Sequence, residues 1–173
     1  MITVAAIVLI AVVVVAVVIA LPKNGNAVPL PSYLDRCVTS VLYHAHPNLA
    51  IVINGTTFTI PSQVGIQGGC NKPIHTHDTS GTLHVETDDN RDYTLHDFFL
   101  IWGNWENNLQ RPIFNSTQIF GAHVVGTHTL TLTVNGNPEP LLQNYVIPRN
   151  AQSGSEVCST TPCQAINMVV TYT

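Results

Sequence analysis

The chain has 173 residues, of which 10 are acidic and 6 are Lys or Arg, and its formal net charge is −4 at pH 7. Charged residues make up only 9% of the sequence, so no basic stripe is available to neutralise a phosphate backbone, and this argues against a nucleic-acid partner. A surface with so few charges has to be built from Thr, Asn, Ser, Gln and Gly, which is more typical of extracellular β-proteins than of cytosolic enzymes.

The N-terminal segment is the most apolar part of the chain. Residues 2–21 consist almost entirely of Val, Ile, Ala and Leu and include no charged side chain, and about 20 such residues can cross a bilayer as a helix. A cleavable signal peptide usually has a shorter apolar core behind a positively charged start. We therefore favour an uncleaved membrane anchor, with cleavage after Gly25-Asn26-Ala27 as the alternative. The chain divides into a hydrophobic helix (1–21), a linker (22–32) and one β-domain (33–173), which is long enough for its own core.

The β-domain is predicted to lie outside the cell. Lys23, just beyond the apolar run, weakly favours a cytoplasmic flank, but the sequence also contains four cysteines and two Asn-x-Ser/Thr sequons, at Asn54 and Asn115. Disulfides and N-linked glycans are typical of oxidising, extracytoplasmic compartments. We expect an anchored protein of the cell surface that can carry N-linked glycan.

The four cysteines allow three disulfide pairings, and the sequence alone does not choose among them. Proximity along the chain favours Cys158 with Cys163, which leaves Cys37 with Cys70. The second bridge would tie the start of the domain to the loop directly before His75. A thiolate metal site is the competing interpretation, but no CxxC spacing is present.

The remaining sequence is typical of a mainly β fold. Val38 to His46 is rich in β-branched and aromatic residues. The segments that flank Asn54-Gly55 and Asn135-Gly136 have hairpin patterns, because Asn-Gly readily adopts the positive φ angles of a tight turn. Further strands are expected at 74–78, 82–87, 141–147 and 165–172. About seven short strands at this spacing predict an extracytoplasmic β-sandwich or small β-barrel with one short helix.

The single convincing helix of the β-domain follows Tyr93. Thr94 can cap its N-terminus, and the apolar residues that follow have helical spacing: Leu95, Phe98, Phe99 and Trp102. Gly103 is expected to end it. Aromatic residues at this spacing more often fill a core than hold a ligand, so we expect them to pack under the sheet.

Five of the eight histidines lie within about forty residues, in a pattern that favours metal binding. Two imidazoles separated by one residue on a strand project to the same face, and two such pairs brought together can surround a metal ion. The expected ligands are the five clustered histidines with a carboxylate: His44, His46, His75, His77 and His84, with Asp78 or Glu86. The carboxylates could instead orient imidazole N–H groups. Copper and zinc are the practical candidates outside the cell.

The other three histidines are weaker candidates for metal ligands. His96 points away from the apolar face of the predicted helix, and His123 and His128 are expected to be ordinary strand residues, with a second metal site as the alternative. Ser80 lies near His77 and Asp78 but lacks the strand-turn-helix setting that exposes a serine nucleophile. The Asp78-Thr79-Ser80-Gly81 stretch is similar to the Asp-Thr/Ser-Gly of aspartic proteases, but a second copy is absent, so we expect a turn.

Several motifs follow one another over residues 42–104: His44-Ala45-His46, the hairpin at Ile51 to Gly55, Ile60-Pro61, Gly65-Ile66, Cys70, the block from His75 to Glu86, and Leu95-x-x-Phe98-Phe99-x-x-Trp102-Gly103. In this order they resemble a family of exported, membrane-anchored proteins of archaea and bacteria, and the resemblance implies no particular activity. His75-x-His77 is similar to the start of the cupin metal motif. In cupins, however, a glutamate follows four or five residues after the second histidine. This chain has Gly81 and Thr82 there, which argues against a cupin.

Three classes of function are compatible with these features. The leading hypothesis is a surface-anchored protein that binds copper or zinc through its histidine cluster. The second is a metal-dependent extracytoplasmic enzyme. The third is a pilin-like subunit of an archaeal surface filament, in which residues 2–21 would mediate self-assembly in the filament core instead of anchoring in a membrane. The third class is weakened because Met1 directly precedes the apolar run. Archaeal type IV pilins resemble precursors in which a charged leader precedes the apolar segment and is then cut off.

Overall fold

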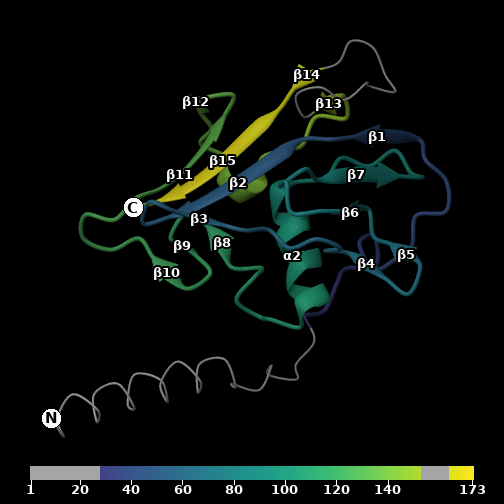
Figure 1. Cartoon of the computed structure of the whole chain (residues 1–173), viewed down its shortest axis with the longest axis horizontal. Coiled ribbons are helices and arrows are strands. Elements are labelled where there is room, and N and C mark those ends of the chain that lie inside the picture. Colours follow the sequence, from purple (N-terminus) through teal and green to yellow (C-terminus); the bar gives the residue numbers. More distant parts are fainter. Residues whose placement is uncertain (1–27, 153–163) are drawn as a thin grey trace, which may run out of the picture.

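The computed structural model describes residues 28–152 and 164–173. The predicted N-terminal helix (1–21), the first residues of the linker, and both Cys158 and Cys163 lie outside these ranges. Within them, no helix is both long and apolar enough to span a membrane. The described part of the chain is mainly β with one short α-helix, as predicted (Figure 1).

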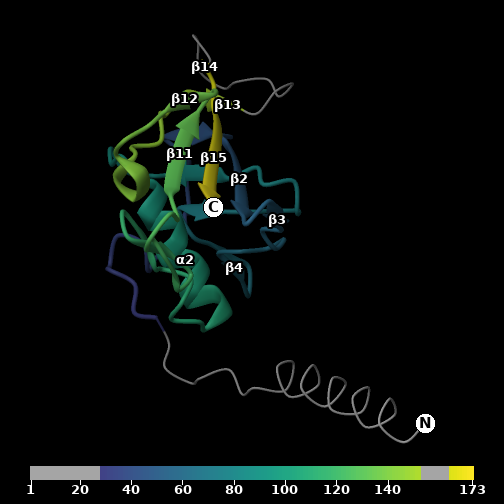
Figure 2. The same cartoon turned by 90° about the vertical axis from the view of Figure 1, so that its left-hand side faces the viewer.

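The largest sheet has five strands in the order β12-β11-β15-β2-β3. Their bounds are Asn137–Pro138 (β12), Leu130–Val134 (β11), Asn167–Tyr172 (β15), Asn48–Ile53 (β2) and Thr56–Phe58 (β3). Figure 2 shows β11, β15, β2 and β3 side by side. β2 and β15 pair in parallel, whereas the other neighbours are antiparallel. Both predicted Asn-Gly turns are confirmed, at Asn54-Gly55 and Asn135-Gly136, with positive φ at all four residues.

A three-stranded antiparallel sheet carries the histidine motifs. Its order is β1-β7-β6, with bounds Tyr43–Ala45 (β1), His84–Thr87 (β7) and Ile74–His75 (β6). β1 leads into β2 through His46 and Pro47, so one extended segment runs from this sheet into the five-stranded one (Figure 1). Leu83 N donates to Pro47 O at 2.9 Å, and Leu49 N donates to Gly81 O at 2.8 Å. The segment before β7 is thereby hydrogen-bonded to the junction of the two sheets.

The remaining described strands form two short pairs and a second small three-stranded sheet. They are β4 (Ile66–Gln67) with β5 (Cys70–Asn71), β8 (Phe114–Asn115) with β9 (Gln118–Ile119) and β10 (Ala122–His123), and the parallel pair β13 (Ala151–Gln152) with β14 (Gln164–Ala165). The strands that the structure describes do not close a barrel, so the barrel alternative is wrong.

The helix α2 (Leu95–Glu106) begins where the sequence predicts. Thr94 and Asp97 form a capping box, in which Asp97 N donates to Thr94 Oγ1 at 3.4 Å and Thr94 N donates to Asp97 Oδ2 at 2.8 Å. The predicted end at Gly103 is wrong, because the helix continues to Glu106 and stops at Asn107, which has φ 54. Gly103 is instead a packing position: a Cβ there would lie 2.6 Å from the Pro112 ring.

The core lies between α2 and the two larger sheets. Leu95, Phe98, Phe99 and Trp102 are all fully buried, which confirms their predicted packing role. α2 contacts β6 and the 3₁₀ helix η1 (Leu142–Asn144). Along β1 and β7 the buried side chains alternate with partly exposed ones, so one face of the three-stranded sheet packs on the core and the other carries the polar groups.

Further strand predictions differ from the structure. The strand predicted at 74–78 ends at His75, so His77 lies beyond it. No strand spans 141–147, because this segment contains η1. The strand predicted at 38–46 begins only at Tyr43, and the two residues before it are exposed, at 53% for Val41 and 61% for Leu42. Composition favoured strands at 38–46 and 141–147, but their backbone contacts are isolated: Val146 forms a single bridge with Thr94, and Val38 N donates to Asn71 O.

Candidate metal centre

The three-stranded sheet brings the histidine motifs to one face. β1 contributes His44, and His46 follows directly. The central strand β7 contributes His84 and Glu86, and β6 contributes His75. The antiparallel register places His44 opposite Glu86 and His75 opposite His84. Because side chains alternate along each strand, the groups in these positions share the face that the core does not use.

The five predicted histidines come together as a single cluster around His84. Its ring centroid lies 5.4 Å from that of His44, 4.4 Å from His46, 5.4 Å from His75 and 4.3 Å from His77. Two sets of three histidines each place one nitrogen per residue within 4.8 Å of the others: His44, His46 and His84, and His75, His77 and His84. Groups of this size and spacing could hold a metal ion.

His75 is the most completely buried member of the cluster, with 0% exposure. Its Nδ1 lies 3.0 Å from Lys72 O, so this nitrogen donates and Nε2 is the acceptor or ligand atom. Nε2 is buried and has no hydrogen-bond partner among the described residues. Burial lowers the pKa of His75, which favours the neutral imidazole that a metal ion requires.

His84 occupies the centre of the cluster and is also held neutral. Burial lowers its pKa to about 3, and the four neighbouring imidazoles act in the same direction. Its Nδ1 lies 3.1 Å from His44 Nε2. A ring in this position cannot gain a proton without placing positive charge against its neighbours, so the ground state is an uncharged nitrogen donor.

Glu86 supplies a carboxylate to the same face. Its Oε1 lies 2.9 Å from His44 Nε2 and 4.0 Å from His75 Nε2. The hydrogen bond with His44 lowers the pKa of Glu86 to about 2, although burial acts in the opposite direction. The group is therefore ionised at neutral pH, and it can either orient an imidazole or bind a metal ion itself.

Asp78 is placed differently from Glu86. Hydrogen bonding from the Ser80 side chain, and from Ser80 N at 2.8 Å from Asp78 Oδ1, lowers the pKa of Asp78. Asp78 belongs to neither three-histidine set. The Asp78-Thr79-Ser80-Gly81 stretch is thus a turn between His77 and the strand β7. Gly81 has φ +83, and a Cβ there would lie 2.3 Å from Leu49 O. Only glycine lets the turn approach the backbone of β2 this closely.

The remaining three histidines lie elsewhere. His96 is on α2, and His123 is exposed on β10. His128 stacks on Tyr172 with a centroid distance of 5.3 Å and an interplanar angle of 12°. None of the three belongs to a three-residue group that could hold a metal within the described ranges.

Two contacts of the cluster were not predicted. His46 Nδ1 lies 3.4 Å from Gln152 Oε1, and Gln152 is buried on β13. The Lys72 carbonyl fixes the orientation of His75. No sequence pattern predicts either partner, because the first is more than a hundred residues away and the second is a backbone atom.

The predicted Cys37–Cys70 disulfide is present. Cys70 lies in β5, two residues before Lys72, so the bridge constrains the segment whose carbonyl orients His75. Of the two sequon asparagines, Asn54 is exposed in the turn after β2. Asn115 is part-exposed on β8, where its Oδ1 accepts hydrogen bonds from Thr117.

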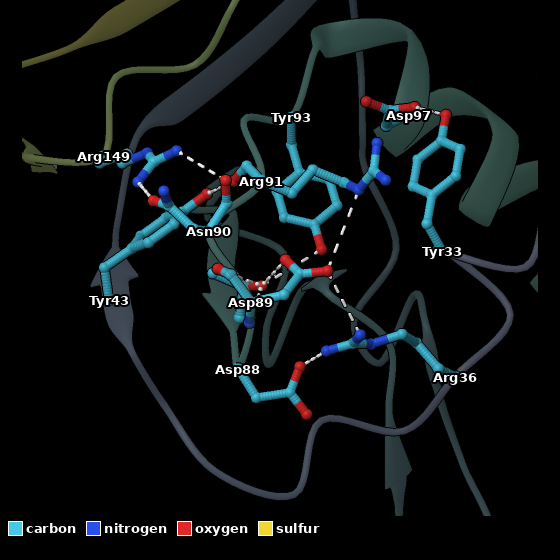
Figure 3. A network of polar contacts seen from close by, with 11 residues as sticks. Tyr33, Arg36, Tyr43, Asp88, Asp89, Asn90, Arg91, Tyr93, Asp97 and Arg149 are labelled. Atoms are coloured by element: carbon cyan, nitrogen blue, oxygen red, sulfur yellow. Dashed lines mark hydrogen bonds and ion pairs between the residues drawn. The ribbon is translucent and has the colours of Figure 1, made fainter.

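An ion-pair network fastens the far end of β7. Arg36 pairs with Asp88 and Asp89, and Arg149 donates to Asn90 (Figure 3). Arg149 also pairs with Asp92. The segments joined in this way include the start of the domain and the loop after β7. The strand that carries His84 and Glu86 is therefore held at its end as well as by its two neighbours.

No protein-family profile, curated protein or solved structure matches the chain. The geometry of the cluster is thus the only guide to its chemistry.

Proposed function

We propose that this domain is an extracytoplasmic transition-metal-binding module, anchored through residues 2–21, which takes up zinc or copper at the histidine cluster. The observation that carries the proposal is the convergence of five imidazoles on one sheet face, with His84 at their centre. Imidazole nitrogens with a carboxylate are a donor set that suits Zn²⁺ and Cu²⁺.

The protonation state of the cluster supports this proposal. The pKa values of His75 and His84 are both lowered, so these rings are neutral donors at physiological pH and require no proton loss before binding. The alternative use of such a cluster is a hydrogen-bonded polar surface. That alternative leaves the buried His75 Nε2 without a partner, at a desolvation cost of about 1–3 kcal/mol.

The position of the cluster favours exchange of the ion with the surroundings. His75 is fully buried, whereas His77 in the same set is exposed. A closed structural site normally surrounds its ion completely. A site with one exposed ligand can accept an ion from solution and pass it to another protein, and it could also admit a substrate.

The location and anchoring are supported by separate features. The Cys37–Cys70 disulfide is typical of oxidising compartments, and the uncharged segment 2–21 has the length of a membrane helix.

Metal analysis of the purified full-length chain tests the proposal. The protein would be stripped with a chelator, dialysed against Zn²⁺ or Cu²⁺, desalted and measured by inductively coupled plasma mass spectrometry. We expect bound metal in the parent protein and reduced metal when His75→Ala and His77→Ala are combined. The matched control is His123→Ala, which removes an exposed imidazole outside the cluster and should leave the metal content unchanged. A parent protein that retains no metal would reject the proposal.

A further inference from the structure

The arrangement of the cluster is two-sided. The order β1-β7-β6 places His84 and Glu86 on the central strand. One histidine pair lies on each side of them: His44 and His46 on the β1 side, and His75 and His77 on the β6 side. The rings within the pairs are 4.2 Å and 5.0 Å apart, measured between centroids.

Both groups on the central strand reach both sides. His84 belongs to the two three-histidine sets, and it is the only residue that they share. The Glu86 carboxylate lies 2.9 Å from the nearest nitrogen of His44 and 4.0 Å from that of His75. The central strand therefore offers each pair an imidazole and a carboxylate.

The number of donors exceeds what one ion uses. A zinc ion in a protein typically takes four ligands, whereas this face presents five imidazoles and one carboxylate. An ion held by one set would use only one of the two histidine pairs. Two ions, by contrast, would each have a complete set of three imidazoles with access to Glu86.

We propose that the cluster is a two-ion centre, in which one divalent transition-metal ion is held by His44 and His46, a second is held by His75 and His77, and His84 bridges them through its two ring nitrogens. His84 Nδ1 lies 3.1 Å from His44 Nε2, which places Nδ1 on the β1 side, and the proposal gives the other ring nitrogen, Nε2, to the ion on the β6 side. When both nitrogens coordinate, the ring N–H proton is released to water. The inference rests on the metal-binding function proposed above and deepens it.

Stoichiometry distinguishes this centre from a single-ion site. Metal-free full-length protein would be titrated with Zn²⁺ and examined by native mass spectrometry, in a His123→Ala/His128→Ala background that removes the exposed histidines outside the cluster. We expect two ions per chain. Combining His44→Ala with His46→Ala should leave one ion, and combining His75→Ala with His77→Ala should also leave one.

Cu²⁺ provides a measurement that needs no cluster variant and so does not depend on how the buried His75 tolerates substitution. Two Cu²⁺ ions joined by one imidazole couple magnetically, so the paramagnetic resonance signal at two equivalents should fall well below that of two isolated ions. A single bound ion in the parent protein, or two ions with an uncoupled signal, would overturn the two-ion centre and leave the metal-binding function intact. Absence of any bound ion would overturn both.

Discussion

His75 and His84 are cross-strand partners in the β6–β7 pair, and their rings stack at an interplanar angle of 19° with centroids 5.4 Å apart. The pairing joins a fully buried imidazole to the imidazole at the centre of the cluster. It also means that a metal ion bound by both residues connects two neighbouring strands. Binding should therefore stabilise the sheet as well as fill the site.

The first prediction concerns this stabilisation. A ligand present at 100 times its Kd and bound only by the folded state adds about 2.7 kcal/mol to the free energy of unfolding. For a domain of this size the gain corresponds to a Tm increase of roughly 5–10 °C. We expect Zn²⁺ to raise the Tm of the parent protein by this amount in differential scanning calorimetry. His84→Ala should lose most of the increase, and His123→Ala should keep it. An equal increase in His84→Ala would show that the metal stabilises the protein from another site.

The second prediction concerns the pH dependence of the metal-free protein. The pKa of His84 is about 3 in the folded state and 6.5 ordinarily, so between these values the unfolded state binds more protons than the folded state. The free energy of unfolding should therefore fall as the pH is lowered below 6.5. The ring is only part-buried, so the slope from this residue should be shallower than about 1.4 kcal/mol per pH unit.

Urea unfolding in the presence of a chelator would measure this slope. Measurements between pH 6.5 and about 5 avoid the titration of Glu86, whose ordinary pKa is 4.5 and whose folded pKa is lowered to about 2. We expect His84→Asn to have the shallower slope. The same pH dependence in both proteins would contradict the conclusion that the fold disfavours the protonated form of His84.

Local sequence patterns predicted much of this sheet face, and long-range pairing accounts for what they missed. Alternation in the segment 82–87 correctly placed His84 and Glu86 on one face, and the Thr94 cap located the start of α2. The parallel pairing of β2 with β15 joins segments more than a hundred residues apart, and no local pattern encodes it. The helix end predicted at Gly103 is wrong for the same reason, because the role of Gly103 depends on its contact with Pro112.

The third prediction tests the turn between His77 and β7. Gly81 and Gly136 have nearly equal φ angles, +83 and +80, but a Cβ at Gly81 would lie 2.3 Å from Leu49 O whereas a Cβ at Gly136 meets nothing within 4 Å. Gly136→Ala should cost only the backbone strain of a left-handed residue, about 1–2 kcal/mol. Gly81→Ala should cost about 1–3 kcal/mol more, since it adds a steric overlap.

Urea unfolding of both glycine variants would separate the free-energy cost of backbone strain from the cost of steric overlap. The Gly81 substitution should also weaken Zn²⁺ binding, because relief of the overlap displaces the turn that links His77 to His84. Gly136→Ala, in a turn of the other sheet, should bind Zn²⁺ as the parent protein does. Equal losses of stability in the two variants would show that the approach to Leu49 is not a tight one.

The fourth prediction concerns the Cys37–Cys70 disulfide, which spans a sequence separation of 33 residues. Closing a loop of this length lowers the entropy of the unfolded chain and stabilises the folded state by about 3–4 kcal/mol in the chain-entropy description. Replacing both cysteines by serine should lower the free energy of urea unfolding by this amount. It should also raise the m-value, since the unfolded chain becomes more expanded.

The same cysteine variant separates stability from site geometry. The disulfide constrains the segment that includes Lys72, whose carbonyl accepts the hydrogen bond from His75 Nδ1. If that constraint orients the ligand, the variant should bind Zn²⁺ more weakly even under conditions where it is fully folded, and isothermal titration calorimetry at low temperature would detect the loss. An unchanged affinity in the folded variant would show that the β6–β7 pairing alone positions His75.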